Sequence, residues 1–481
     1  MKDCILQKRT VLAVLLTCLQ VEISCGYLLS NNDEYQVWLT TGDQTRKLSR
    51  EAPCPVTSQH HGYSVWVDRN KRRQTIDGFG AALTNSAAYV IFHSPVRNQI
   101  LTELFGSGVN DLGVNYIRLP MGSSDLNAVD PYTYDDMPSG QTDFELNHFS
   151  IEKDKAFIIP ILKEALSINP HLKLMATPWT APAWMKTTKN VFGGEFINDS
   201  RYMQTYAQYF VKFFEAYKAE GITFDSFSVQ NEPVLSKNDY PTMILNIDPM
   251  KVFIRDHLGP LLRQRNIKTK LLIWDHNWSG SWYPEAVLSD RNVAQYVSGV
   301  AWHGYDGRHN APEAFHHKHP NVDMYFTEYS GGGWNQNYAD VLTTETRLIF
   351  IGQTKSWAKN VLLWNLALDE HHGPTKHVGG CRDCRGVITV RTGSSSYTKN
   401  VEYYAMGHMS KFVKPGAVRL EANYFKWDDL QCVAFQNTDG STVIVVQNPN
   451  TRNSANFSLD IDAKHYQYNN LPPRSVVTFV K

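Results

Sequence analysis

The segment Phe224-Asp-Ser-Phe-Ser-Val-Gln-Asn-Glu-Pro233 is a short, largely apolar run that ends at a carboxylate and is broken at once by a proline. A second segment, Asp323-Met-Tyr-Phe-Thr-Glu-Tyr-Ser-Gly-Gly-Gly333, has the same arrangement with glycines in place of the proline. Short apolar runs bounded by Pro or Gly are typical of buried strands. Each segment therefore predicts a strand, with Glu232 and Glu328 at the two carboxyl ends.

Further runs of this kind lie in the middle of the chain, and amphipathic segments of helical period separate them. The eight strand candidates cover residues 75–84, 116–122, 172–179, 224–230, 271–275, 297–305, 322–329 and 361–368. The helix-like segments include residues 151–168, 202–220, 249–265 and 338–359. This alternation predicts an α/β fold, a closed (β/α)8 TIM barrel, and a doubly wound open sheet is the structural alternative.

Both ends of the chain have a different pattern. Short β-branched runs occur at residues 63–67, 432–436, 442–446 and 476–480, and Asp439-Gly440 is a hairpin signal between two of them. We therefore expect residues 27–73 and 407–481 to form an antiparallel β-sandwich built from both chain ends. The catalytic barrel would take residues 74–406.

The composition is that of a well-packed globular protein and excludes some classes of partner. Lys plus Arg and Asp plus Glu number 47 each, so the formal net charge is zero and no nucleic-acid footprint is present. Hydrophobic residues make up 42% of the chain and aromatic residues 12%, which also suits a sugar-binding surface.

The amino terminus has the layout of a secretory signal peptide. Lys2, Lys8 and Arg9 precede an apolar run at 11–21, which ends in small residues near Gly26, so we expect residues 1–26 to be removed. The run is too short for a membrane anchor, which needs about 20 apolar residues. Secretory passage also fits three glycosylation sequons, at Asn198, Asn277 and Asn456.

The two glutamates suggest a reaction. Carboxyl ends of barrel strands face one common mouth, and the fourth and seventh strands lie across it from each other. Two carboxylates facing across a pocket can hydrolyse a glycosidic bond, because one protonates the leaving oxygen while the other attacks or activates water. The alternative is that Glu232 and Glu328 are ordinary surface acids.

A set of motifs identifies a family resemblance. In order, they are QTIDGFGAALT (74–84), YIRLPMG (116–122), TPWTAPAW (177–184), QNEP (230–233), WHGY (302–305) and LWNLAL (363–368). Together they resemble glycoside hydrolase family 30, and most of all its glucosylceramidases, over essentially the whole mature chain. The resemblance implies hydrolysis of β-glycosides with retention, with Glu232 as acid/base and Glu328 as nucleophile. Retention requires carboxyl groups about 5 to 5.5 Å apart.

The resemblance also implies substrate-binding residues. Arg118 would keep the nucleophile charged, with a structural salt bridge under the site as the alternative, and Asn231 would bind the sugar 2-hydroxyl. Indole faces of two tryptophans would bound the sugar, unless they are core residues. The full set is Asn85, Arg118, Trp179, Asn231, Tyr240, His303, Tyr305 and Trp364.

Two features depart from the glucosylceramidases. The family has an aspartate after its Gly-Phe-Gly segment, where this chain has Asn85. The loop at 379–386, Gly-Gly-Cys-x-x-Cys-Arg-Gly, resembles members acting on β-1,6-glucans at least as well. For Cys381 and Cys384 we expect a short disulfide, with a zinc site as the alternative. Cys54 and Cys432 could form a second bridge if their Cα atoms lie about 4.4 to 6.8 Å apart.

The sequence thus predicts a retaining β-glycoside hydrolase without a metal or organic cofactor. The main hypothesis is a lysosomal or extracellular glucosylceramidase, which cleaves glucosylceramide with help from anionic lipid and a saposin-like activator protein. One alternative is a secreted β-1,6-glucanase or other polysaccharide β-glycosidase. Another is an inactive extracellular glycan-binding or matrix protein that keeps the fold.

Overall fold

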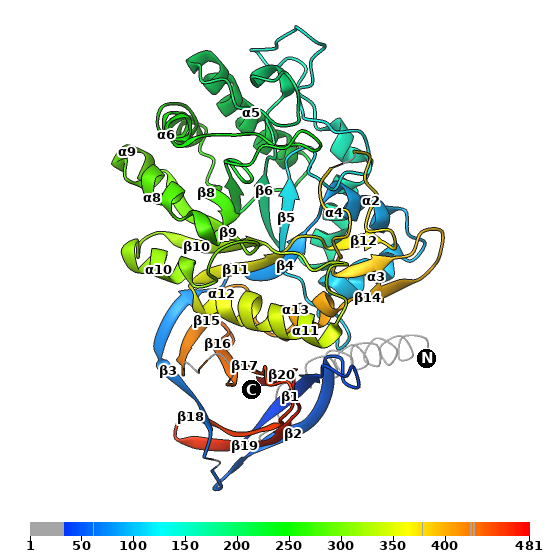
Figure 1. The fold of residues 1–481 in the computed structure, drawn as a ribbon, viewed down its shortest axis with the longest axis vertical. Coiled ribbons are helices and arrows are strands. Elements are labelled where there is room, and N and C mark those ends of the chain that lie inside the picture. The colour runs from blue at the N-terminus through cyan, green and yellow to red at the C-terminus, as the bar shows by residue number, and fades with distance from the viewer. Residues whose placement is uncertain (1–32, 61, 378, 424–425, 427–428) are drawn as a thin grey trace, which may run out of the picture.

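The computed structural model describes residues 33–481 except 61, 378, 424–425 and 427–428. The predicted signal peptide, residues 1–26, lies outside the described residues. Two closed sheets make up most of the molecule, a helix-covered barrel and a smaller β-domain below it in the view of Figure 1. A three-stranded sheet of β12 (Ala367–Asp369), β13 (Ile388–Val390) and β14 (Tyr397–Lys399) follows the last barrel strand. Both ends of the described chain lie in the β-domain.

The larger sheet is the predicted eight-stranded barrel. All its pairings are parallel, and β11 pairs with β4 through Asn360 and Gly78, which closes the ring and excludes the open sheet. Each predicted strand is present. They are β4 (Gly78–Ala82), β5 (Tyr116–Pro120), β6 (Lys173–Thr177), β7 (Ser226–Ser228), β8 (Lys270–Asn277), β9 (Val297–His303), β10 (Asp323–Glu328) and β11 (Ala358–Leu363).

Helices surround the barrel, as Figure 1 shows. Two of the predicted helices, at 249–265 and 338–359, each contain a π-helical segment, Phe253–Leu258 and Glu345–Ile351. The helices are α2 (Asn85–Phe92), α3 (Arg97–Phe105), α4 (Ile158–Ile168), α5 (Ser200–Ala219), α6 (Ile247–Val252), α7 (Gly259–Gln264), α8 (Trp282–Leu288), α9 (Arg291–Ala294), α10 (Ala311–Lys318), α11 (Tyr338–Thr344), α12 (Gly352–Lys355) and α13 (Val401–Ser410).

Close packing of the barrel explains the Gly-Phe-Gly motif in β4. A Cβ atom on Gly80 would come within 1.8 Å of the Tyr116 carbonyl oxygen of β5, so no larger residue fits there. Phe79, between the glycines, is fully buried in the core. The motif therefore allows strands β4 and β5 to pair closely while one large side chain fills the space beside them.

The second sheet confirms a β-domain built from both chain ends. Its nine strands close in the order β1-β2-β19-β18-β3-β15-β16-β17-β20. They are β1 (Glu34–Thr40), β2 (Ser49–Thr57), β3 (Ser64–Thr75), β15 (Val418–Ala422), β16 (Gln431–Gln436), β17 (Thr442–Asn448), β18 (Ala455–Ile461), β19 (Lys464–Leu471) and β20 (Ser475–Val480).

One pairing in this sheet differs from the predicted antiparallel arrangement. Strands β3 and β18 run parallel, with Ser64 opposite Ser458. A tight turn forces neighbouring strands to be antiparallel, but the whole barrel lies between these two in sequence. Their relative direction is therefore set by the closure of the sheet.

Helix α13 connects the two sheets. The predicted domain boundary between residues 406 and 407 falls inside this helix. The helix is also bonded to the β-domain, through its buried His408. The His408 ring lies 2.8 Å from the Thr40 hydroxyl of β1 and 2.7 Å from the Thr478 hydroxyl of β20. Burial lowers the pKa of His408 to about 3, so the ring is neutral and acts as a hydrogen-bonding spacer.

The cysteines of the β-domain are not paired. Cys54 and Cys432 are both buried free thiols, so the second bridge considered from the sequence is not formed. Burial raises the pKa of each to about 11, which makes both unreactive at neutral pH. Within the part of the chain that the structure describes, we find no helix both long and apolar enough to span a bilayer.

Candidate active site

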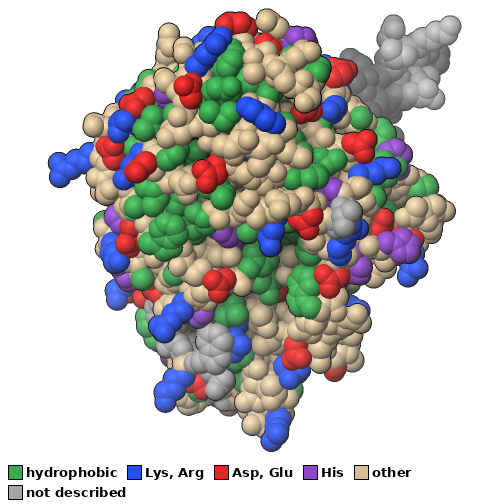
Figure 2. All heavy atoms as spheres, turned by 45° about the horizontal axis from the view of Figure 1, so that its top comes forward, with side chains coloured by type: hydrophobic (Ala, Val, Ile, Leu, Met, Phe, Trp, Pro, Cys, Tyr) green, Lys and Arg blue, Asp and Glu red, His purple; other side chains and the backbone are tan. Residues whose placement is uncertain are grey.

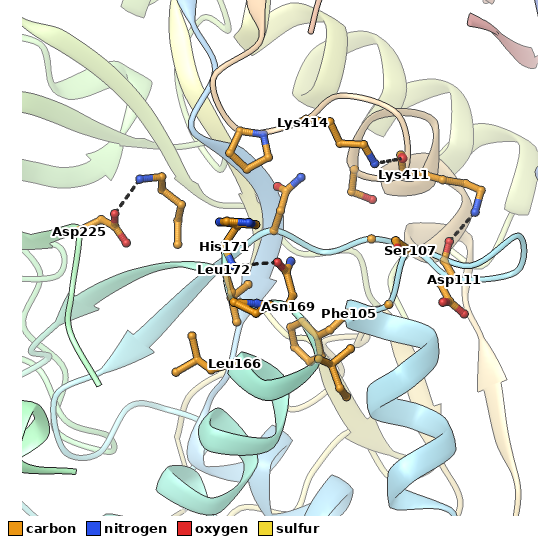
Figure 3. Close-up of a pocket in the computed structure, with 18 of the residues that line it drawn as sticks. Phe105, Ser107, Asp111, Leu166, Asn169, His171, Leu172, Asp225, Lys411 and Lys414 are labelled. Carbon is orange, nitrogen blue, oxygen red and sulfur yellow. Dashed lines mark hydrogen bonds and ion pairs between the residues drawn. The ribbon is translucent and has the colours of Figure 1, made fainter. Parts of the chain in front are cut away.

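The molecule has a large cavity that does not contain the predicted residues. It measures about 1060 Å³ and lies where the barrel strands begin, lined among others by Asn115, Lys173 and Asp225 (Figure 3). Lys173 pairs with Asp225 at 2.7 Å, and Lys411 donates to the Asp111 carbonyl at 2.8 Å. In TIM barrels this end contributes stability, whereas chemistry occurs at the carboxyl ends of the strands.

A second cavity, of about 470 Å³, opens at the carboxyl ends and is the candidate active site. Nine of the predicted residues line it, namely Trp179, Asn231, Glu232, Tyr240, Tyr305, Glu328, Trp364, Cys381 and Cys384. Sequence reasoning missed six others, namely Asp125, Lys237, Asp239, Ser330, Trp334 and Gly380. The two glutamates predicted from opposite strands therefore share one cavity.

Glu328 is held by a cation and a hydroxyl. The fully buried Arg118 donates to one carboxyl oxygen at 2.5 Å, and the Tyr305 hydroxyl donates to the other at 3.0 Å. The other arm of the Arg118 guanidinium bonds Asp275 at 2.8 Å. Arg118 thus forms the buried salt bridge considered from the sequence, and it also contacts the Glu328 carboxylate, as its predicted role beside the nucleophile requires.

Arg118 also orients Asn231. It donates to the Asn231 side-chain oxygen at 2.7 Å, so the amide NH₂ group of this residue is left for the cavity that it lines. An amide NH₂ group can donate to a sugar hydroxyl. The predicted contact to the 2-hydroxyl therefore has a donor of fixed orientation.

Glu232 sits in an unusual backbone conformation between two histidines. Its φ is +48°, in the left-handed region that non-glycine residues rarely adopt. The Nδ1 atoms of His276 and His303 lie 3.1 and 3.2 Å from its Oε1. Burial alone would raise the pKa of Glu232, but the two histidines outweigh burial and lower it to about 2. Both contacts are to Oε1, so Oε2 is the oxygen that can meet a substrate.

His303 lies between the two glutamates, behind the cavity wall. It is fully buried, and its Nε2 lies 3.0 Å from Asp275 Oδ1 and 3.8 Å from Glu328 Oε2. Burial alone would lower its pKa, but the charge of Glu328 and the contacts to Asp275 and Glu232 raise it to about 9. A single charged imidazole therefore connects both glutamates.

A bulge in β8 explains why Asp275 and His276 escaped prediction. Consecutive side chains of a regular strand point to opposite faces, so only one of the two is expected inside the barrel. The register of β8 against β9 shifts between Trp274 and His276, and Trp274 and Asp275 both have positive φ values, +76° and +51°. The extra residue turns both Asp275 and His276 toward the glutamates.

The contact from His276 gives a testable pH dependence. Replacing His276 by Asn removes a side chain whose contact lowers the Glu232 pKa, so Glu232 would keep its proton to higher pH. If Glu232 is the proton donor, the basic limb of the kcat/KM profile moves up by about one pH unit. The control is His171→Asn, at an exposed residue of the other cavity. A basic limb that stays in place or moves down would contradict this role.

Trp179 and Trp364 form one wall of the cavity. Their rings stack with centroids 5.1 Å apart, and the Arg118 guanidinium carbon lies 4.8 Å from the Trp179 ring centroid. Each is only 2% exposed, so these residues are both buried and part of the cavity lining. Stacking on a cation fixes the indole planes, which suits a surface for one face of a sugar.

Asn85 does not line the cavity. Its side-chain oxygen accepts from the Ala128 N–H at 2.9 Å, and its NH₂ group lies 3.4 Å from the Tyr132 hydroxyl, so the amide supports the following loop. The nearby lining carboxylate is Asp125, which accepts from the Cys381 N–H at 3.1 Å. Burial and the charge of Glu328 raise the pKa of Asp125 to about 7.

The predicted disulfide between Cys381 and Cys384 is present, with a Cα separation of 5.5 Å. Oxidised sulfurs cannot supply the thiolates of a zinc site, so that alternative is excluded. Of the three sequons, Asn198 and Asn456 are exposed. Asn277 is half-buried at the end of β8, and its side-chain oxygen accepts from the Tyr305 N–H at 3.1 Å. Glycosylation at all three stays a prediction.

Two groups of side chains in the described part of the chain could approach a metal ion. They are Glu232 with His276 and His303, and His60 with Asp460 and His465, each with donor atoms within 4.8 Å of one another. The contacts within these groups are 2.7 to 3.2 Å, which are hydrogen-bond distances. Among these atoms His276 Nδ1 makes no hydrogen bond of good geometry, so its contact with Glu232 is a close approach only.

The closed parallel barrel, with paired carboxylates beside stacked tryptophans at its mouth, defines a glycoside hydrolase of the (β/α)8 class. The chain belongs to glycoside hydrolase family 30. The TIM-barrel domain of this family matches residues 76–413, and its β-sandwich domain matches residues 416–479. The division between the two matches falls just after α13, which agrees with the position of that helix against both sheets.

Relatives of two activities are similar to this chain. An endo-1,6-beta-D-glucanase of Neurospora crassa is 34% identical over 433 residues, which cover 86% of this chain and 88% of the relative. The lysosomal acid glucosylceramidase of Mus musculus is 31% identical over 80% of this chain and 77% of its own length. A solved endo-beta1,6-glucanase is 32% identical with a TM-score of 0.85, covering 93% of this chain and 99% of that one.

Proposed function

We propose that this chain is a retaining endo-β-1,6-glucanase. The similarity to β-1,6-glucanases in both sequence and structure supports this alternative better than the glucosylceramidase predicted first. The single observation that carries the chemistry is the arrangement of Glu232 and Glu328 on one cavity, connected by one imidazole. Retention is taken from the family resemblance, and it requires the two carboxyl groups to lie about 5 to 5.5 Å apart.

In the first step Glu328 would attack the anomeric carbon. A bond forms between that carbon and a Glu328 oxygen as the bond to the leaving sugar breaks, and Glu232 gives its proton to the leaving oxygen. Arg118 and the Tyr305 hydroxyl hold Glu328 for this attack. The proton is shared between Glu232 and the imidazole of His303, whose Nδ1 lies 3.2 Å from Glu232 Oε1.

In the second step water would release the sugar. Glu232, now a carboxylate, takes a proton from the water, which bonds to the anomeric carbon as the ester to Glu328 breaks. The Asn231 NH₂ group donates to the sugar through both steps. All protons and bonds balance with these side chains and one water, so the sequence of steps ends with the enzyme in its starting state.

Glucosylceramide is the second candidate substrate, on the similarity to the mouse enzyme. The surroundings of the cavity are polar, since Lys237 and Asp239 of its lining are exposed, as are Arg382 and Asp383 between the two cysteines of the disulfide. Figure 2 shows a face on which acidic and basic side chains are interspersed. Such surfaces suit a polysaccharide better than the anionic lipid or activator protein that a lipid substrate would involve.

The proposed setting is the secretory pathway, with an extracellular or lysosomal destination. A disulfide at the cavity fits this setting because such bonds persist in oxidising compartments. A glucanase acts on polymers outside the cell, so extracellular release is the destination that matches the proposed substrate.

The test compares hydrolysis of a linear β-1,6-glucan with that of glucosylceramide in anionic detergent. The expected result is rapid release of β-1,6-linked oligosaccharides, with the β-anomer formed first by proton NMR, and slow turnover of the lipid. Preference for glucosylceramide would overturn the proposal in favour of the second candidate. Tight binding of glucan by folded protein without turnover would point to the inactive binding protein.

A further inference from the structure

Two aromatic side chains at the cavity are unusually exposed. Trp334 is 56% exposed and Tyr305 44%, whereas the inner pair, Trp179 and Trp364, are 2% each. All four line the same cavity. The Tyr305 hydroxyl donates to Glu328. Trp334, in contrast, is too exposed to be a core residue, and in the described part of the chain it forms no hydrogen bond with either glutamate.

The Trp334 ring is fixed against its own loop. A Cβ atom on Gly332 would come within 2.1 Å of this ring, so the indole lies against the glycine backbone and a larger residue there would displace it. The loop is also tied to the disulfide loop, since the Gly333 N–H donates to the Asp383 carbonyl at 2.8 Å. An isolated β-bridge joins Gly332 to Cys384.

Arg385 reinforces this connection from behind. Its backbone N–H donates to the Gly331 carbonyl at 2.9 Å, and its guanidinium lies 3.4 Å from the carbonyls of Gly332 and Asn335. The buried Glu402 of α13 holds the guanidinium through contacts of 2.8 and 3.0 Å. The ring of Trp334 is therefore pre-organised, which lowers the entropy lost when a ligand stacks on it.

The geometry points to a sugar-binding subsite on Trp334 for the glucosyl unit on the leaving-group side of the scissile bond. This inference rests on the proposed function. The sugar that reacts lies against the inner, buried wall of Trp179 and Trp364, so the leaving chain must pass out through the mouth. Trp334 is the exposed indole along that path.

A β-1,6 linkage makes such a platform more useful. The linkage runs through an exocyclic CH₂ group and so has one more rotatable bond than a linkage between ring carbons. A flexible chain loses more entropy when its leaving unit is ordered for proton transfer. Stacking of the leaving glucosyl unit on a rigid indole offsets this loss and places the leaving oxygen near Glu232.

The test uses Trp334→Ala with two substrates. On β-1,6-gluco-oligosaccharides we expect kcat/KM to fall about 10- to 100-fold, mostly through KM, as for the loss of one or two good stacking contacts. On β-glucosyl fluoride, whose leaving group is a single atom, the change should stay within about threefold. Trp334→Phe should recover part of the loss because it keeps an aromatic face.

The matched control is Trp282→Ala, since Trp282 is 53% exposed at the start of α8 and lies outside the cavity lining. Arg385→Lys should give the same substrate-selective loss, smaller in size. Equal losses of Trp334→Ala on both substrates, or none on either, would overturn the subsite. If the wild type cleaves the fluoride but no β-1,6-oligosaccharide, the proposed function fails, and the subsite falls with it.

Discussion

Glu328→Gln is expected to reduce hydrolysis of both β-1,6-glucan and β-glucosyl fluoride by more than about 10⁴-fold, as for loss of a covalent nucleophile. An amide cannot form the ester intermediate, although it fills the same volume and keeps one oxygen that can accept from Arg118. Glu232→Gln should lose about 10²- to 10⁴-fold on glucan but much less on the fluoride, because fluoride departs with little help from an acid. Initial rates on both substrates give the comparison.

Azide separates the two roles further. In Glu232→Gln azide can attack the glycosyl-enzyme without a base and give β-glucosyl azide, whereas in Glu328→Gly it takes the vacated position and gives the α-anomer. The anomer is read by proton NMR. Glu285→Gln is the control, because that partly exposed acid pairs with Lys318 near the outer surface. The same anomer from both variants, or normal rates in either, would contradict the assignment.

The fold was accessible from the sequence because its strong signals are local. Each barrel strand is a short apolar run, and Pro233 and the Gly331–Gly333 run stop two of them just past Glu232 and Glu328. In a parallel barrel, a residue at the carboxyl end of a strand lies at the face where the active-site cavity opens. A carboxylate at that point is therefore visible from sequence, as were the disulfide and the pairing of β16 with β17 across Asp439-Gly440.

The site residues that the sequence did not predict lie where the chain departs from regular strand or helix geometry, so the hydrophobic pattern does not give the direction of their side chains. Asp275 and His276 enter the site through the bulge in β8, and Asp125 and Trp334 lie in irregular segments beyond β5 and β10. The direction of a side chain there follows from tertiary contacts, such as the bond from the Cys381 N–H to Asp125. For the same reason Asn85 was expected in the cavity although its amide is used by Ala128.

Arg118→Met is expected to lower the free energy of unfolding by about 3 to 5 kcal/mol, the cost of breaking a buried ion pair. Arg118 is fully buried and is bonded to Asp275 and Glu328, so its removal leaves two buried carboxylates without this cation. Activity should fall by more than about 10²-fold, since Glu328 and Asn231 both lose the group that orients them. Urea unfolding and initial rates on β-glucosyl fluoride measure the two effects.

The control for stability is Arg265→Met, because the exposed Arg265 pair with Glu215, at 3.5 Å, should contribute only about 0 to 1 kcal/mol. Similar losses in Arg118→Met and Arg265→Met would mean that the buried network contributes no more than a surface contact.

Adding Asp275→Asn to Arg118→Met separates the structural from the chemical part of this network. Burial alone would raise the pKa of Asp275, but Arg118 and His303 hold it well below its usual range, so this residue is charged in the native site. Without Arg118 that charge is a source of instability, and an amide removes it. The double variant should therefore regain part of the lost unfolding free energy, while activity stays low because Glu328 still lacks its guanidinium. A double variant less stable than Arg118→Met would contradict this. It would show that the ion pair of Asp275 with His303 contributes more stability than the unpaired charge costs.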